Sequence, residues 1–332
     1  MRSSHIDRRA LLQFSLAVGA LLPSCKVFAG TPATFPPPDQ EFMVPVSSGR
    51  VYVRVNGRLD SPRLPVVLIH GGPGGNHAAF LNLLALRDER SVILYDQLDC
   101  GLSDHPGKPE NWTVARFTSE VDAVRRALHI PRWHVLGQSW GGTIALEYGA
   151  RRPPELAGLV LASPLVSTRS WIADANTLRA RLPAAVQATL RGCEPPAPIT
   201  HACRQATNIF YANYLGRTPT PKAYRDYVAA HRRLGFNEQL YEAMWGSSEF
   251  VATGTLRGYD GEPLLANLDG KRTLFIDGQY DEARPPTLAA FAALAHGADF
   301  GVVPGSAHAM FFDRPDEALG IIRPWFREHD GA

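Results

Sequence analysis

Residues 137–141 read Gly-Gln-Ser-Trp-Gly, a G-x-S-x-G pattern with Ser139 at its centre. In such a pattern the serine occupies a sharp turn between a strand and a helix, and the glycines leave room where those two elements meet. The context fits, because the apolar run 133–136 comes directly before the pattern and a helical run, 142–150, follows it. The pattern therefore predicts that Ser139 is the nucleophile of an acyl-transfer reaction. A glycine-rich loop at the end of a strand is the alternative interpretation, since the bare pattern is common.

A second glycine-rich segment, 70–74, reads His-Gly-Gly-Pro-Gly and follows the apolar run 66–69. Attack of a serine on a carbonyl group places negative charge on the carbonyl oxygen, which two backbone N–H groups can stabilise. One donor is the residue after the nucleophile, and the other comes from a loop after an earlier strand. We therefore expect the amides of Trp140 and Gly72 to form an oxyanion hole. An ordinary glycine- and proline-rich turn is the alternative for 70–74.

The acid that would orient a catalytic histidine is expected at the carboxyl end of a later strand. Asp281 follows the apolar run 273–276 and is our candidate. Asp277 and Glu282 are rivals within the same loop, and a loop carboxylate without a catalytic role is the simplest alternative.

The candidate base is His308, which follows the apolar run 300–303. The chain order is thus Ser139, Asp281, His308, which is the order of serine hydrolases with the α/β-hydrolase fold. A neutral His308 would accept the proton of Ser139 and return it to the leaving group, while Asp281 fixes the tautomer.

These residues need a parallel sheet to bring them together, and the chain has the matching pattern. Short apolar runs alternate with helical stretches, which is typical of βαβ units. One such stretch, 114–128, has apolar residues at steps of three and four. We predict an α/β-hydrolase fold with a mostly parallel sheet, formed by 42–164 and 262–332, with a helical cap inserted at 165–261. The predicted strands are 51–55, 66–70, 92–95, 134–136, 159–161, 273–276 and 300–303.

Composition and charge exclude some classes of function. The 332 residues are 45% hydrophobic and 20% charged, as in globular proteins. The net charge of +2 arises from the first 29 residues, so the remainder is close to neutral and has no basic stripe that would bind nucleic acid. We expect a small substrate and neither a cofactor nor a metal. The oligomeric state stays open.

The first 29 residues resemble a signal peptide of the twin-arginine type. Arg8 and Arg9 precede an apolar run that is too short to span a membrane, and small residues end at Ala29. We predict export to the periplasm or beyond, with residues 30–41 as a proline-rich linker. Lipid attachment at Cys25 is the alternative to cleavage after Ala29, which we favour. Cys193 and Cys203 could form a disulfide after export or remain free thiols.

Three segments together are similar to the proline iminopeptidase (prolyl aminopeptidase) family of serine peptidases: 70–74, 95–104 and 137–142. The resemblance extends from about residue 42 to 329. It implies that Glu249, within 244–250, and Glu282 bind the free α-amine of a substrate. Departures from the family pattern are Asp99, where glycine is commoner, and Trp245 and Ser247, where asparagine and proline are commoner.

The resemblance implies an aminopeptidase that releases an N-terminal residue, preferably proline, from short peptides through an acyl-enzyme. The same triad would serve an amino-acid amidase or arylamidase, or a carboxylesterase or lactonase. A catalytically silent binding protein would need only the pocket, but every catalytic position holds a competent residue type.

Overall fold

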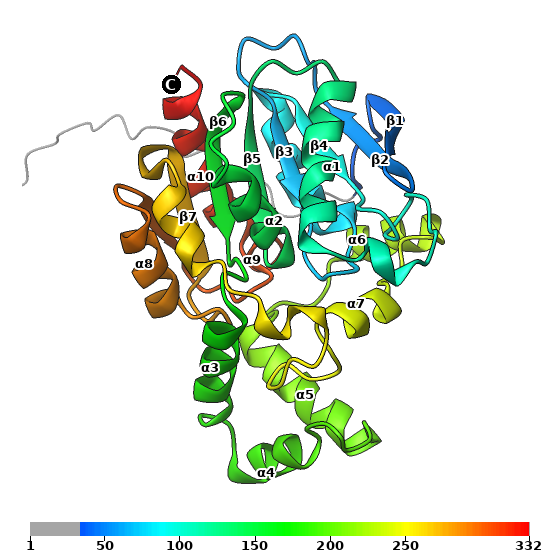
Figure 1. Ribbon diagram of the computed structural model, residues 1–332, viewed down its shortest axis with the longest axis vertical. Helices are drawn as coiled ribbons and strands as arrows, with labels where there is room; N and C mark the ends of the chain where they lie inside the picture. The colour runs from blue at the N-terminus through cyan, green and yellow to red at the C-terminus, as the bar shows by residue number, and fades with distance from the viewer. Residues whose placement is uncertain (1–33, 332) are drawn as a thin grey trace, which may run out of the picture.

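The computed structural model describes residues 34–331, which form an eight-stranded sheet with helices on both faces (Figure 1). The strand order is β1-β2-β4-β3-β5-β6-β7-β8. The β1–β2 and β2–β4 pairs are antiparallel, and all later pairs in the sheet are parallel. The strands are β1 (Gln40–Val46), β2 (Gly49–Asn56), β3 (Val66–Ile69), β4 (Val92–Tyr95), β5 (Trp133–Gln138), β6 (Leu156–Ala162), β7 (Thr273–Gly278) and β8 (Asp299–Val303).

The central strands are apolar on both sides because each side faces a separate core. Val135 of β5 belongs to one hydrophobic cluster and its neighbour Leu136 to another. β6 alternates in the same way, with Leu161 in the first cluster and Val160 in the second. This arrangement produces continuous apolar runs in the sequence and explains why the strands could be recognised.

Helices cover each core. The cluster that contains Val135 packs against α1 (Val114–Ala127), α2 (Trp140–Gly149) and α8 (Pro285–Leu294). The cluster that contains Leu136 packs against the 3₁₀ helix η1 (His77–Asp88), α9 (Met310–Asp313) and α10 (Pro315–His329). The apolar face predicted for 114–128 is buried, with Phe117, Val121 and Val124 fully covered. The fold class predicted from the sequence is confirmed.

β1 was not predicted, and it begins at Gln40, within the residues assigned to a linker. It is an edge strand that pairs only with β2, and most of its residues are at least partly exposed. Pro45 lies within it, which only an edge strand tolerates. The apolar pattern that marks a buried strand is therefore missing here.

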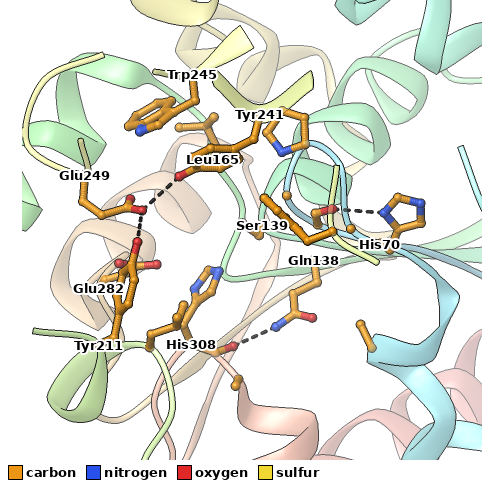
Figure 2. Close-up of a pocket in the computed structure, with 18 of the residues that line it drawn as sticks. His70, Gln138, Ser139, Leu165, Tyr211, Tyr241, Trp245, Glu249, Glu282 and His308 are labelled. Carbon is orange, nitrogen blue, oxygen red and sulfur yellow. Dashed lines mark hydrogen bonds between the residues drawn. The ribbon is translucent and has the colours of Figure 1, made fainter. Parts of the chain in front are cut away.

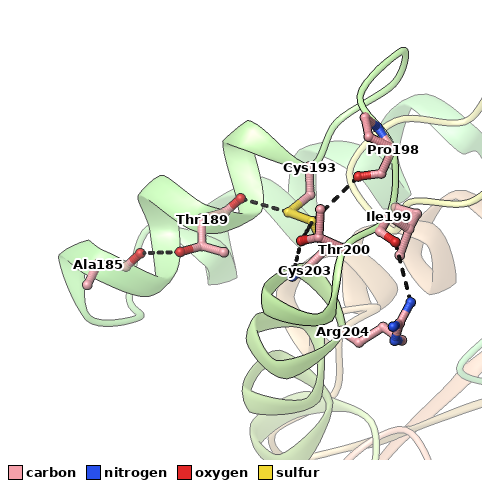
Figure 3. Close-up of a disulfide and its surroundings, with 8 residues drawn as sticks. All are labelled: Ala185, Thr189, Cys193, Pro198, Ile199, Thr200, Cys203 and Arg204. Carbon is pink, nitrogen blue, oxygen red and sulfur yellow. Dashed lines mark hydrogen bonds between the residues drawn. A yellow bond between two sulfur atoms is a disulfide. The ribbon is translucent and has the colours of Figure 1, made fainter.

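The segment between β6 and β7, predicted as a cap, is helical. It contains α3 (Thr168–Arg179), α4 (Ala184–Gly192), α5 (His201–Tyr214), α6 (Lys222–Ala230) and α7 (Glu238–Met244). Figure 1 shows α3, α4 and α5 extending away from the sheet, where they share a small hydrophobic cluster of their own. Cys193 and Cys203 form a disulfide between α4 and α5, so of the two alternatives the structure has the bridge (Figure 3).

Helix α6 instead lies against the main body of the protein. The Tyr227 hydroxyl lies 2.8 Å from Nε2 of His77 and accepts a hydrogen bond from Arg54 at 2.9 Å. These contacts attach part of the inserted segment to the sheet. The predicted signal peptide, its cleavage site and Cys25 lie outside the described residues. None of the helices within 34–331 is both long and apolar enough to cross a membrane.

Candidate active site

Ser139 lies in the turn between β5 and α2, with φ of 56° and ψ of −121°. A positive φ is strained for a residue other than glycine, and such strain concentrates at functional sites. The two glycines of the pattern are required by space, because a Cβ at Gly137 would collide with the Gly141 carbonyl and a Cβ at Gly141 with that of Ile69. The backbone N–H of Ser139 donates to the Ala162 carbonyl at 3.0 Å, which ties the turn to β6.

His308 and Asp281 form a hydrogen-bonded pair beside this turn. They follow β8 and β7, and the carboxyl ends of parallel strands meet at one edge of the sheet. Nδ1 of His308 lies 2.9 Å from Oδ1 of Asp281, and both residues are buried. The side-chain amide of Gln138 donates to the His308 carbonyl at 2.7 Å, so the residue before Ser139 also fixes the histidine loop.

The charge balance around His308 favours the imidazolium. Burial alone would lower the pKa of His308, but the charge and hydrogen bond of Asp281, with smaller contributions from Glu282 and Glu249, raise it to about 9. Ser139 and His308 line the same cavity, yet within the described part of the chain no hydrogen bond joins their side chains. Such bonds often tighten only when substrate is bound.

The glycine loop lies against the other side of Ser139. Gly72 has φ of 119°, and Gly71 lies so close that a Cβ there would be 3.0 Å from the Cβ of Ser139. The amide of Trp140 belongs to the first turn of α2, where N–H groups have no partner within the helix. Trp140 is itself held in place, since its indole N–H donates to Gln97 at 2.9 Å.

Two carboxylates from distant parts of the chain line the same cavity (Figure 2). Glu249, which follows α7, accepts hydrogen bonds at Oε1 from the hydroxyls of Tyr211 at 2.6 Å and Tyr241 at 2.9 Å. Glu282 is 3% exposed, and its Oε2 has no hydrogen-bond partner among the described residues. Burial and the negative charge of Glu249 hold the pKa of Glu282 well above its usual range. An additional donor or cation entering the cavity would satisfy this oxygen.

The sequence did not predict Tyr211, Tyr241 and Trp171 as parts of the site. Tyr211 lies on α5 and Tyr241 on α7, and no local pattern connects them with Glu249. Trp171 of α3 packs edge-on against the His308 ring, with centroids 5.5 Å apart. Burial and the charge of Glu249 raise the pKa of both tyrosines, so their hydroxyls stay protonated and can donate.

The cavity that contains these groups has a volume of about 490 Å³. Glu249 and Glu282 are its carboxylates, and apolar side chains form much of the remaining wall, among them Leu165, Phe236 and Phe312. Within residues 34–331, no three His, Cys, Asp or Glu side chains are grouped so that they could hold a metal ion. Because Ser139, Glu249 and Glu282 line one cavity, the site can combine a serine that accepts an acyl group with carboxylates that bind an organic cation.

Comparison with known proteins agrees with this arrangement. A family model described as the α/β hydrolase fold matches residues 65–315. The chain is 33% identical to a proline iminopeptidase of Heyndrickxia coagulans over 78% of this chain and 88% of that protein. It is 32% identical to one of Levilactobacillus brevis over 88% and 97%, respectively. Among solved structures, a proline iminopeptidase of Mycobacterium smegmatis is 34% identical with a TM-score of 0.78, covering 88% of this chain and 99% of that one.

Proposed function

Because this chain belongs to the proline iminopeptidase family within the α/β-hydrolase fold, we propose that it is a serine aminopeptidase that releases an N-terminal residue, preferably proline, from short peptides. The observation that carries the proposal is the shared cavity. Ser139 lines the same cavity as two carboxylates, Glu249 and Glu282.

The carboxylates would bind the protonated α-amine. A cation in a partly dry cavity needs opposite charge and hydrogen-bond acceptors, and an ammonium donates strongly to carboxylate oxygens. Oε2 of Glu282 offers such an acceptor. An acetylated N-terminus is uncharged, so it would not form this ion pair and would leave Oε2 of Glu282 without a partner.

Ser139 would attack the carbonyl of the first residue while Nε2 of His308 accepts the hydroxyl proton. The amides of Trp140 and Gly72 would stabilise the oxyanion, and Asp281 would hold the imidazolium. His308 then protonates the departing amine, which leaves the aminoacyl group as an ester on Ser139. Water, deprotonated by the same histidine, hydrolyses that ester.

The bound amine would also lower the pKa of the catalytic base, His308. Negative charge on Glu249 and Glu282 contributes to the raised pKa of His308. A substrate ammonium placed between those carboxylates opposes their effect, so amine binding lowers the pKa of His308 and favours the neutral form that accepts a proton. Substrates with a free amine would therefore both bind and activate the base.

We also propose that the protein is exported through a twin-arginine signal within residues 1–29. The disulfide between Cys193 and Cys203 supports this proposal, because such bonds persist in oxidising compartments. Replacing Arg8 and Arg9 together with lysine should retain the enzyme inside the cell. Unchanged export of that variant would refute the twin-arginine route.

A substrate panel tests the catalytic proposal. We expect proline 4-nitroanilide to be hydrolysed faster than the alanine and leucine anilides, and N-acetylated anilides to be hydrolysed poorly. Equal rates on free and acetylated amines would refute an aminopeptidase. Faster hydrolysis of nitrophenyl esters that lack an amine would indicate an esterase instead.

A further inference from the structure

A second buried carboxyl group, that of Asp277, contacts the same serine hydroxyl as Asp281 of the His308–Asp281 pair. Asp277 is the fifth residue of β7 and is fully buried, and Asp281 is 1% exposed. Ser163, which directly follows β6, lies between them. Its Oγ is 2.6 Å from Oδ2 of Asp281 and 3.2 Å from Oδ1 of Asp277. Two carboxyl groups therefore share the neighbourhood of one hydroxyl.

The hydrogen-bond donors are distributed unequally. Asp281 accepts from His308 and from the Ala283 amide at Oδ1, and the Ser163 hydroxyl donates to its Oδ2 at the shorter of its two distances. These donors stabilise a carboxylate. Asp277 accepts the amide of Gly278 at Oδ1, at 3.0 Å, and its Oδ2 is buried with no donor among the described residues.

A single hydroxyl proton cannot satisfy both carboxyl groups. Since Ser163 gives its proton to Asp281, an ionised Asp277 would carry a buried charge with one donor and would repel Asp281. A protonated Asp277 removes the repulsion and adds a donor beside Asp281, whose carboxylate the same Ser163 hydroxyl contacts.

We propose that Asp277 is a protonated carboxylic acid that donates a hydrogen bond to Asp281 and, together with the Ser163 hydroxyl, holds that carboxylate in position for His308. Asp277 is thus a positioning residue for the proposed triad, and its proton stays in place through the reaction while His308 carries the transferred proton. The backbone of Ser163 has φ of 44°, a strained value that places its hydroxyl between the two carboxyl groups.

The charged groups around Asp277, Ser163 and Asp281 agree with a protonated Asp277 and an ionised Asp281. Burial, followed by the charge of Asp281, holds the pKa of Asp277 well above its usual range. Burial would raise the pKa of Asp281 too, but His308, Ser163 and the Ala283 amide lower it. The other charged groups nearby are Glu282 and Glu249 beside His308, and Asp174 of α3, which is paired with Arg284 at 3.0 Å.

The first test is the pH profile of kcat/KM for Asp277→Asn. Asparagine keeps the shape and can still donate to Asp281, so we expect kcat/KM within about threefold of the wild type and an unshifted acid limb, because no charge is lost. If Asp277 is ionised, its replacement removes a negative charge near His308 and moves that limb to lower pH by about one unit or more, which would overturn the proposal.

Asp277→Ala is the matched variant without a donor. We expect its kcat/KM to fall about tenfold or more below that of Asp277→Asn, since Asp281 loses a charge-assisted hydrogen bond. Equal activity of the two variants, at equal thermal unfolding midpoints, would show that the donated bond has no role and would overturn the proposal.

Infrared spectroscopy tests the proton independently of any aminopeptidase activity, on which the kinetic test depends. Difference spectra between the wild type and Asp277→Asn at neutral pH should contain the carbonyl band of one protonated carboxylic acid. The spectrum of Glu282→Gln identifies any band that Glu282 contributes. Loss of a carboxylate band instead of an acid band in Asp277→Asn would overturn the proposal even if peptidase activity were absent.

Discussion

Replacing Glu249 with glutamine tests the proposed amine site by removing one charge and little else. The carboxylate accepts hydrogen bonds from Tyr211 and Tyr241 at Oε1. A glutamine oxygen can accept the same two bonds with nearly the same shape. The negative charge that would hold the substrate ammonium is what the Glu249→Gln variant loses.

A hydrogen bond to a charged group contributes about 1.5–3 kcal/mol, which corresponds to a fall in kcat/KM of about 10- to 150-fold. The charge of Glu249 is one cause of the raised pKa of Glu282. Its loss lets Glu282 ionise more readily and replace part of the missing attraction. We therefore expect the fall for proline 4-nitroanilide to lie in the lower part of that range.

The assay compares two anilides that differ at one atom. In the 4-nitroanilide of tetrahydrofuran-2-carboxylic acid, an ether oxygen replaces the ring NH₂⁺ of proline, so no cation reaches the carboxylates. The Glu249→Gln variant should hydrolyse this analogue within about twofold of the wild-type rate, since no charged hydrogen bond is lost. An equal fall for both substrates would place the damage in folding or in the triad, and no fall for either would remove Glu249 from amine binding.

Three further predictions concern the nucleophile, the base and the cap. Ser139→Ala should lower kcat by about 10⁶-fold without changing the thermal unfolding midpoint, and turnover at the wild-type rate would exclude Ser139 as nucleophile. The rise of kcat/KM with pH should have its midpoint near 9, since His308 accepts a proton only when neutral. The midpoint for kcat should lie at lower pH, because a bound ammonium opposes Glu249 and Glu282; coincident midpoints would contradict that coupling. Replacing Cys193 and Cys203 together with serine should lower the free energy of unfolding measured in denaturant by about 2–3 kcal/mol, since the bridge closes a short loop, and an unchanged value would mean that the cap does not limit stability.

Local patterns were sufficient for the sheet and for the residues placed at its edge. Each central strand is buried between two cores and so has a short apolar run that can be read directly. Ser139 and Asp281 follow such strands, β5 and β7, while His308 follows β8, a partly exposed strand at the edge of the sheet. Parallel strands carry their carboxyl ends to a common edge. The edge strand β1 has one exposed side and a proline, so its residues lack the continuous apolar run that marks a buried strand.

The inserted segment could be predicted only as helical. Which residues of α5 and α7 meet depends on how amphipathic helices pack against one another and against the sheet, and contacts between residues far apart in the chain decide that. Tyr211 and Tyr241 both donate to Glu249, although they precede it by 38 and 8 residues, and no spacing rule connects the three.

The sequence by itself determined the fold class, the turn at Ser139 and a short set of acids at the end of β7 and just after it, because these depend on local patterns and on chain order. It favoured Asp281 over Asp277 and Glu282 only by position after the apolar run 273–276, and that position says nothing about the surroundings of each carboxyl group. The tertiary structure decides those surroundings: it brings the donors of His308 and Ser163 to Asp281, beside the local amide of Ala283, and leaves Asp277 buried with the amide of Gly278. The difference is one of environment, because two of the donors that stabilise the Asp281 carboxylate, His308 and Ser163, lie 27 and 118 residues away in the chain.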